Sequence, residues 1–280
     1  MRVIGRHSTG IALGAVLTTA MAALGPFPAP TVTDALADRT QPHVLLDDEV
    51  AEVLVRVRGS SACSGTPITG TRLVITAAHC VLDGAGEVTA VTVVRDGMEH
   101  TPRAVLVDPR YFAAPGPHLD AAVLVLDRAI PGAAATLGEA LPTQGIVTLA
   151  GFQPIDTDGT LLRGTTYDNR PTPKGVTGGF VEIESLPSGC VDRASSIEVA
   201  PDELKIGCGL IPGASGGGLF AESGGNVVLL GIISTVGRDL SYNGVTPLAA
   251  VRELLNHPSE YTHAVPDERA STTDAPITRQ

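Results

Sequence analysis

The 280-residue sequence contains no tryptophan, and only 3% of its residues are aromatic. Its hydrophobic core must therefore be built from aliphatic side chains, because apolar residues still make up 43% of the chain. Aliphatic residues branched at Cβ favour strands. Positive charge is also scarce: the formal net charge is −11, and no segment is rich in lysine or arginine. Such a chain would repel a nucleic-acid backbone, so nucleic acid is excluded as a partner.

The apolar run near the N-terminus, residues 11–25, is shorter than the roughly 20 residues that a transmembrane helix needs. Basic residues precede this run, and "ALA" at residues 35–37 follows it, in the order typical of an export signal. We interpret residues 1–37 as a signal peptide. The mature protein is then secreted and has no stable membrane span. An uncleaved membrane anchor is the alternative.

The sequence has no CxxC pair and no histidine pair at helical spacing, so neither a metal site nor a cofactor is predicted. It contains four cysteines. An even number in an exported chain indicates two disulfides. The cysteines are Cys63, Cys80, Cys190 and Cys208.

Short apolar runs separated by turn residues occupy most of the chain. This pattern predicts an all-β protein built from barrels or sandwiches. The first set of runs covers residues 52–58, 72–76, 90–94, 103–107 and 121–126; the second covers 146–152, 178–184, 217–221 and 226–235. The stretch 130–145, rich in alanine, glycine and proline, separates the two sets and would link two β subdomains.

The only helical pattern lies near the C-terminus. "PLAAVRELLNH", residues 247–257, places Leu248, Val251, Leu254 and Leu255 on one face. The polar residues 258–280 are predicted to form a disordered tail. Residues 38–47 are predicted to form a short N-terminal lead-in.

The segment "CSGTPITGTRLVITAAHC" ends an apolar strand in a small-residue turn that presents His79 beside Cys80. A disulfide from Cys80 back to Cys63 would fix this turn. A fixed imidazole suits a general base, whose orientation and tautomer must be defined. The alternative is a buried structural histidine beside a structural disulfide.

In "HLDAAVLVLD", Asp120 precedes an apolar strand. A buried carboxylate there can remain ionised if it accepts a hydrogen bond from an imidazole. A structural aspartate at the start of a strand is the alternative. Two other aspartates compete for the role: Asp127, expected to face solvent after the strand, and Asp108, in a turn-like context.

In "PGASGGGLF", glycines surround Ser215. Glycines permit positive φ and allow backbone N–H groups to converge on one point. This favours an oxyanion hole formed by the N–H groups of Gly213 and Ser215. A flexible glycine turn is the alternative, since the chain contains 32 glycines.

The order His79, Asp120, Ser215 and the three surrounding motifs resemble those of the chymotrypsin-like (trypsin-like) serine peptidases, in particular the bacterial secreted type. "TAAHC" matches the family's histidine motif, while "DAAVLVL" and "GASGGG" are similar to its aspartate and serine motifs. The resemblance covers residues 48–257. It implies two six-stranded antiparallel β-barrels (48–135 and 146–246), an active site between them and a C-terminal helix (247–257).

The resemblance also implies substrate-binding residues, which are Gly209, Ser234, Val236 and Gly244. No acid lies near Gly209, and Val236 occupies a position where the family often has glycine. We therefore expect a preference for small or medium apolar side chains at P1, the substrate residue before the cleaved bond. Bacterial members often link a cysteine before the serine loop to one after it. Here no cysteine follows Cys208, and Cys190 is its expected partner.

One departure concerns the residue before the serine, which is Ala214 instead of the family's usual acid. In trypsin that acid pairs with a new N-terminus beginning "IVGG", and no such segment precedes residues 52–58. Both partners of the activation switch are absent together, which favours a constitutive enzyme over a decayed one. The sequence predicts a secreted serine endopeptidase acting on protein or peptide substrates. The alternative is a catalytically silent binding protein on the same scaffold.

Overall fold

The computed structural model describes residues 44–46, 48–113, 116–154, 185–200, 203–208, 210, 213–237 and 242–266. The predicted signal peptide and the predicted strand 178–184 lie outside these residues. Within them, no helix has the length and apolar character required to cross a membrane.

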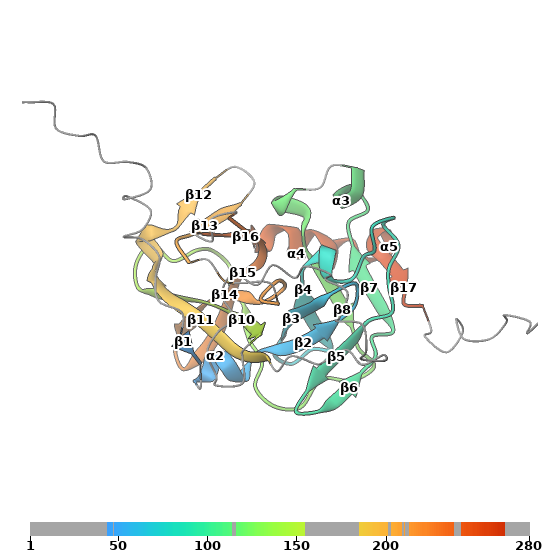
Figure 1. Cartoon of the computed structure of the whole chain (residues 1–280), viewed down its shortest axis with the longest axis horizontal. Helices are drawn as coiled ribbons and strands as arrows, with labels where there is room; N and C mark the ends of the chain where they lie inside the picture. Colours follow the sequence, from blue (N-terminus) through green and yellow to red (C-terminus); the bar gives the residue numbers. More distant parts are fainter. Residues whose placement is uncertain are drawn as a thin grey trace, which may run out of the picture.

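Two antiparallel sheets form the two halves of the molecule, and both curl into half-barrels (Figure 1). The first sheet lies on the right of Figure 1, and its strand order is β17-β7-β8-β4-β3-β2-β5-β6. Its strands are β2 (Val55–Arg58), β3 (Ala62–Pro67), β4 (Leu73–Thr76), β5 (Thr92–Arg95), β6 (Met98–His100), β7 (Ala104–Val107), β8 (Ala122–Val125) and β17 (Thr262–Ala264).

The second sheet lies on the left, in the order β1-β11-β10-β14-β15-β16-β13-β12, with β9 pairing in parallel with β15. Its strands are β1 (Val44–Leu45), β9 (Thr136–Leu137), β10 (Ile146–Pro154), β11 (Ser185–Arg193), β12 (Glu198–Val199), β13 (Leu204–Ile206), β14 (Gly218–Ser223), β15 (Asn226–Val236) and β16 (Asn243–Pro247). The all-β double-barrel prediction is confirmed. Short edge strands bring each sheet above the six strands expected.

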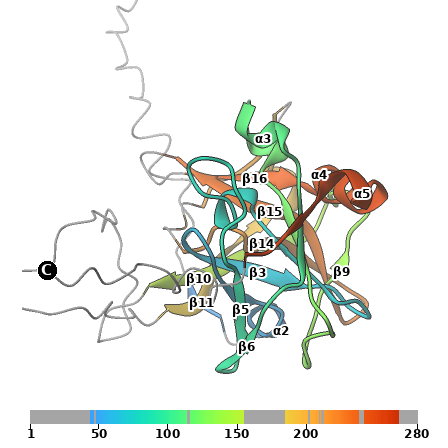
Figure 2. The same cartoon turned by 90° about the vertical axis from the view of Figure 1, so that its right-hand side faces the viewer.

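The described helices are few and mostly short: α2 (Glu49–Glu52), α3 (Arg110–Ala113), α4 (Leu248–Asn256) and α5 (Pro258–Tyr261). Helix α4 confirms the predicted C-terminal helix; of the predicted apolar face, Leu248, Val251 and Leu254 are buried and Leu255 is partly buried. Figure 2 shows α4 and α5 together on one side of the molecule.

The prediction of a disordered tail from residue 258 is wrong for its first seven residues. Pro258 begins helix α5, and Thr262–Ala264 then form β17, which pairs antiparallel with β7. Tyr261 is buried against the core of the first barrel. The polar composition of this segment hid a strand that pairs with an otherwise open sheet edge. Within the predicted lead-in, Val44 and Leu45 pair with β11 as strand β1.

The core is aliphatic, as the composition required. Each barrel has its own cluster of buried side chains, and that of the first barrel extends to Phe220, Leu229 and Ile232 of the second. Close packing between the barrels leaves the strand ends that meet at their junction in fixed positions.

Candidate active site

Strand register alone brings His79 and Asp120 together. Strands β4 and β8 are antiparallel neighbours in which Thr76 lies opposite Ala122. His79 follows the end of β4 by three residues, in a short 3-10 turn (Ala78–Cys80), and Asp120 precedes β8 by two. Both residues therefore lie at the same edge of the first sheet, although 41 positions separate them.

Asp120 holds the histidine by two hydrogen bonds. Its Oδ2 lies 2.8 Å from His79 Nδ1, and its Oδ1 accepts the backbone N–H of His79 at 3.0 Å. The Asp120 side chain is 3% exposed, whereas that of His79 is 31% exposed. The imidazole is thus anchored through one nitrogen on a buried carboxylate, while part of the ring remains open to solvent.

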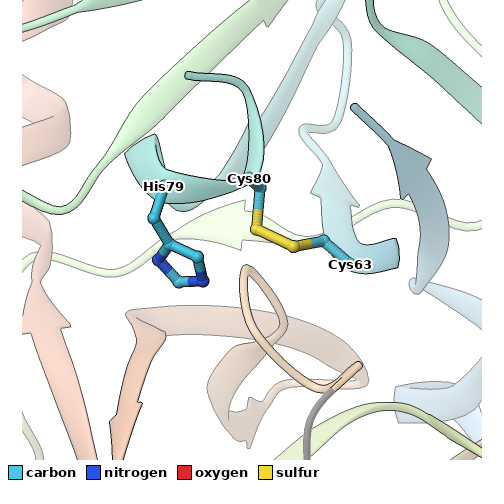
Figure 3. Close-up of side chains that lie close together, drawn as sticks. All are labelled: Cys63, His79 and Cys80. Atoms are coloured by element: carbon cyan, nitrogen blue, oxygen red, sulfur yellow. A yellow bond between two sulfur atoms is a disulfide. The ribbon is translucent and has the colours of Figure 1, made fainter. Parts of the chain in front are cut away.

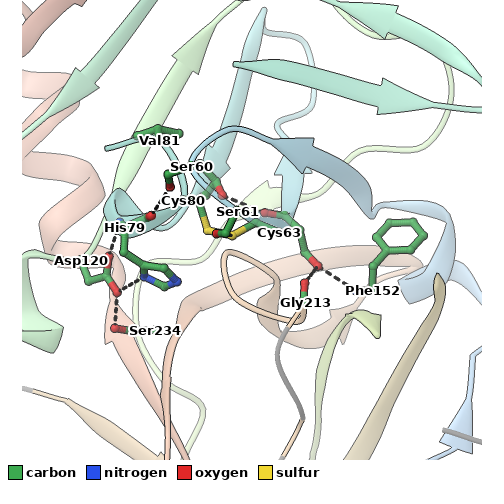
Figure 4. The surroundings of a disulfide bond; sticks show 12 residues. Ser60, Ser61, Cys63, His79, Cys80, Val81, Asp120, Phe152, Gly213 and Ser234 are labelled. Atoms are coloured by element: carbon green, nitrogen blue, oxygen red, sulfur yellow. Dashed lines mark hydrogen bonds and ion pairs between the residues drawn. A yellow bond between two sulfur atoms is a disulfide. The ribbon is translucent and has the colours of Figure 1, made fainter. Parts of the chain in front are cut away.

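Two hydroxyl groups of the second barrel complete the surroundings of Asp120. Ser234 Oγ donates to Asp120 Oδ2 at 2.5 Å, and Thr246 Oγ1 donates to the Asp120 backbone carbonyl at 3.2 Å. Figure 4 shows His79, Asp120 and Ser234 joined in one hydrogen-bonded row. The sequence predicts Ser234 as a substrate-binding residue; in the structure its hydroxyl donates to Asp120. Thr246 carried no sequence signal.

Ser215 lies in a turn whose glycines are structurally required. Gly213 has φ of 108° and Gly216 has φ of 77°, values that strain residues with side chains. Gly216 also packs directly against the strand that leads to His79. A Cβ atom there would lie 2.2 Å from Thr76 Oγ1 and 2.3 Å from the Ser64 carbonyl oxygen. Glycine at this position lets the serine turn reach the first barrel.

Ser64 of β3 fastens the serine turn to the first barrel. Its backbone N–H donates to the Ser215 carbonyl at 2.7 Å, and its hydroxyl donates to the Gly213 carbonyl at 2.8 Å. The same hydroxyl accepts the backbone N–H of Phe152 at 2.7 Å (Figure 4). Sequence reasoning missed this residue. The one available signal was its position next to Cys63, inside the histidine motif.

Ala214, the residue that departs from the family pattern, is 1% exposed within the core of the second barrel. Its backbone and methyl group crowd Gly151, where a Cβ atom would lie 2.8 Å from Ala214 Cα and 3.0 Å from its Cβ. This close approach accounts for the glycine at position 151.

The comparisons with known proteins agree with this geometry. The model of the trypsin-like peptidase domain matches residues 63–230, more than half of the chain. The chain belongs to the trypsin-like peptidase family. It is therefore a serine-type peptidase, and proteins are its substrates.

Solved structures similar to this peptidase include a Glu endopeptidase in complex with MPD, with a TM-score of 0.54 and 15% identity over 79% of this chain and 97% of that one. The thermostable serine protease AL20, from an extremophilic microorganism, has a TM-score of 0.54 and 15% identity. The match covers 76% of this chain and 99% of that one. Protease Anisep from Arthrobacter nicotinovorans has a TM-score of 0.54 and 14% identity, and the match covers 78% of this chain and 100% of that one. At these identities the likeness shows the fold. No curated protein matches the chain.

Both predicted disulfides of the peptidase are present, Cys63–Cys80 and Cys190–Cys208. The first joins β3 to the histidine turn (Figure 3). Among the described residues, Cys63, His79 and Cys80 are the one group of cysteine, histidine and acidic side chains close enough to share a metal ion. Both sulfurs are bonded to each other, so neither can serve as a thiolate ligand.

The two competing aspartates lie in different surroundings. Asp127 is exposed. Asp108 is buried and pairs with Arg110, whose Nη2 lies 2.5 Å from Asp108 Oδ2. The hydrogen bonds from the Arg110 side chain hold the pKa of Asp108 below its ordinary value. The two hydrogen bonds to His79 come from Asp120.

Near Asp120, burial and the negative charge of that carboxylate raise the pKa of Tyr111 to about 12. Sequence reasoning gave no indication of this residue.

Of the predicted substrate-binding residues, Gly209 lies outside the described residues. Val236 ends β15 and is 36% exposed, two residues after Ser234. Gly244 in β16 lies opposite Thr235 of β15. A Cβ atom at Gly244 would lie 2.2 Å from both the Glu203 carboxylate and the Thr235 hydroxyl, so the position accepts no side chain without rearrangement.

Proposed function

We propose that this peptidase is a secreted serine endopeptidase that cleaves peptide bonds with a triad of His79, Asp120 and Ser215. The observation that carries the proposal is the buried Asp120 carboxylate 2.8 Å from His79 Nδ1. It is supported by the serine turn, which is hydrogen-bonded to Ser64 of β3, the strand that the Cys63–Cys80 disulfide joins to the histidine turn.

In the proposed mechanism, His79 accepts the proton of the Ser215 hydroxyl as its oxygen attacks the substrate carbonyl carbon. Asp120 accepts the hydrogen bond from Nδ1, which leaves Nε2 as the basic nitrogen and stabilises the imidazolium that forms. The imidazolium then protonates the leaving amine as the acyl-enzyme forms. Water hydrolyses the acyl-enzyme, again with His79 as base. The reaction requires no cofactor.

The proposed oxyanion hole consists of the N–H groups of Gly213 and Ser215. The next two amides of the turn already have hydrogen-bond partners within the protein. Gly216 N–H donates to the Ile233 carbonyl, and Gly217 N–H donates to the Ala214 carbonyl. Donors fixed in advance stabilise a developing negative charge without reorganising, and loss of one typically costs about 10²–10³ in rate.

For substrate choice, we propose small or medium apolar side chains at P1. Val236 supports this, since its exposed side chain lies on β15 two residues after Ser234, the donor to Asp120, and would narrow a pocket there. A series of peptides that differ only at P1 tests the preference. The highest kcat/KM with arginine or lysine at P1 would contradict it.

Export from the cell is part of the proposal. The apolar segment 11–25 supports it, and so do the two disulfides, which persist in oxidising compartments. Expression of the full chain in a bacterial host, followed by N-terminal sequencing of protein from the medium, tests this part. A mature protein that starts near residue 38 is expected, whereas retention of the intact N-terminus in the membrane fraction would contradict it.

A fluorophosphonate probe tests the catalytic proposal. The wild-type protein should label stoichiometrically, and mass mapping should locate the adduct on Ser215. Ser215→Ala should abolish labelling. Ser223→Ala, which changes an exposed serine of the β14–β15 hairpin, should label like the wild type. A folded wild-type protein that never labels would favour a silent binding protein on this scaffold.

A further inference from the structure

The side chain of Asn243 joins two segments of the second barrel from within. Asn243 begins β16 and is 2% exposed. Its Oδ1 accepts the backbone N–H of Leu210 at 2.6 Å, and its Nδ2 donates to the backbone carbonyl of Thr235 at 2.9 Å. One carboxamide thus pairs with a donor and an acceptor that belong to different parts of the chain.

The two joined segments both lead to the proposed triad. Leu210 lies between Cys208, which is held by a disulfide, and the turn that carries Ser215. Thr235 directly follows Ser234, the donor to Asp120. Asn243 also lies opposite Val236 in the β15–β16 register, so the two side chains share one face of the sheet. Asn243 therefore lies between the segments proposed to contact the substrate.

The contacts explain why an amide occupies this position. A carboxamide can accept from an N–H group and donate to a carbonyl at the same time, whereas an aspartate can only accept at neutral pH and a leucine can do neither. Leu210 is 1% exposed and Asn243 is almost fully buried, so water would have difficulty replacing the bonds. A lost partner would leave a buried polar group unpaired, which is costlier than the bond itself is worth.

We propose that Asn243 is a positioning residue: it fixes the separation between the segment at Leu210 and the segment 234–236, which on the proposed function line the P1 pocket, and thereby sets how strongly the peptidase discriminates between P1 side chains. The inference rests on the proposed function. The serine end of the loop has separate anchors, because Ser64 bonds to both Gly213 and Ser215. Loss of the Asn243 contacts should consequently affect the pocket more than the nucleophile.

The test compares Asn243→Leu, of similar size but without hydrogen bonds, with Asn243→Asp, which keeps the acceptor for Leu210 and guards against a failure to fold. Asn226→Leu and Asn226→Asp are the matched controls, since Asn226 is an exposed residue at the other end of β15. Thermal unfolding verifies the folded state of each variant.

Two quantities are measured for each variant. One is the ratio of kcat/KM for the preferred P1 residue to kcat/KM for glycine at P1. The other is the labelling rate with a small fluorophosphonate that does not fill the pocket. Both Asn243 variants should lose about ten-fold in the P1 ratio while their labelling rates stay within about three-fold of wild type, because one or two buried hydrogen bonds are lost. The Asn226 variants should match the wild type.

An unchanged P1 ratio in a folded Asn243 variant would overturn the inference. A fall in labelling as large as the fall in peptide cleavage, with the P1 ratio unchanged, would also overturn it, because Asn243 would then act only on the serine turn. These results leave the proposed function intact. A wild-type protein that neither labels nor cleaves peptides would overturn the proposed function and this inference with it.

Discussion

The two barrels contribute unequal halves to the proposed active site. The first barrel holds His79 and Asp120 at adjacent strand ends, so the register of β4 and β8 and two short hydrogen bonds define their geometry. The second barrel holds Ser215 in a glycine turn whose position depends on Ser64 of the other barrel. The His79–Asp120 contact thus lies within one barrel and receives further hydrogen bonds from Ser234 and Thr246 of the other, whereas the serine turn takes its position from the packing of the two barrels.

The largest expected effect tests whether the first-barrel half supplies the base. His79→Ala should lower kcat by about 10⁶, because the serine hydroxyl loses the group that removes its proton. Steady-state hydrolysis of a peptide substrate measures this. As a control, His257→Ala changes a half-exposed histidine at the end of α4 and should leave kcat unchanged. A His79→Ala variant that retains even a hundredth of the activity would contradict the assignment.

Asp120→Asn asks whether the carboxylate, and not merely its shape, is needed. The amide can donate a hydrogen bond to His79 Nδ1, which would stabilise the wrong tautomer, and kcat should fall by about 10⁴. The same assay measures this fall. Thermal unfolding should show that the variant is folded. Activity close to wild type would mean that Asp120 only supports the fold. The first barrel would then contribute His79 alone to catalysis.

Ala214→Asp tests whether the buried position before Ser215, in the second barrel, can still accommodate the acid that the family usually has there. The carboxylate would enter the buried apolar contact with Gly151 and find no partner there among the described residues. An uncompensated buried charge typically costs about 3–5 kcal/mol of stability, which denaturant unfolding can measure. Ala249→Asp is the matched control on the exposed face of α4 and should be nearly neutral. An equally stable Ala214→Asp variant would mean that position 214 still accommodates an acid.

Asp108→Asn separates the structural aspartate of the first barrel from the proposed catalytic one. The pKa of Asp108 is lowered in the folded protein, so its contribution is present above its unfolded pKa, near 4, and is lost as the pH falls through the lower folded value. At neutral pH the variant should lose about 1–3 kcal/mol of stability.

The stability gap between Asp108→Asn and wild type should close in acid, and kcat should remain unchanged. Denaturant unfolding from pH 2 to pH 7 measures the gap, and Asp127→Asn, at an exposed aspartate, provides the control. A gap that stays constant with pH would contradict the ion pair with Arg110, and a large fall in kcat would contradict the choice of Asp120 over Asp108.

The contrast between the halves also explains what the sequence could predict. Aliphatic runs located β4, β7, β8 and β15, and a local amphipathic pattern located α4. The contacts of Ser64 could not be read in this way, since they join residues 88 and 149 positions apart and depend on how the barrels pack. Strand β17 was missed for a related reason: the segment THA has no apolar pattern, and pairing with the β7 edge alone makes it a strand.

In the site, too, local patterns could be predicted and contacts between distant residues could not. The motifs around His79, Asp120 and Ser215 are local, so the residues could be named from the sequence. The double role of Asn243 and the bond from Ser234 to Asp120 arise only from the register of β15 with β16 and the junction of the barrels. Residues that position others therefore stayed hidden, while residues with family motifs did not.

A crystal structure of the wild-type protein after reaction with a phosphonate probe tests the central claim most directly. The account predicts phosphorus bonded to Ser215 Oγ, a phosphonyl oxygen within hydrogen-bonding distance of the N–H groups of Gly213 and Ser215, and His79 Nε2 facing the adduct. An adduct on another residue, or a phosphonyl oxygen directed away from both amides, would contradict it.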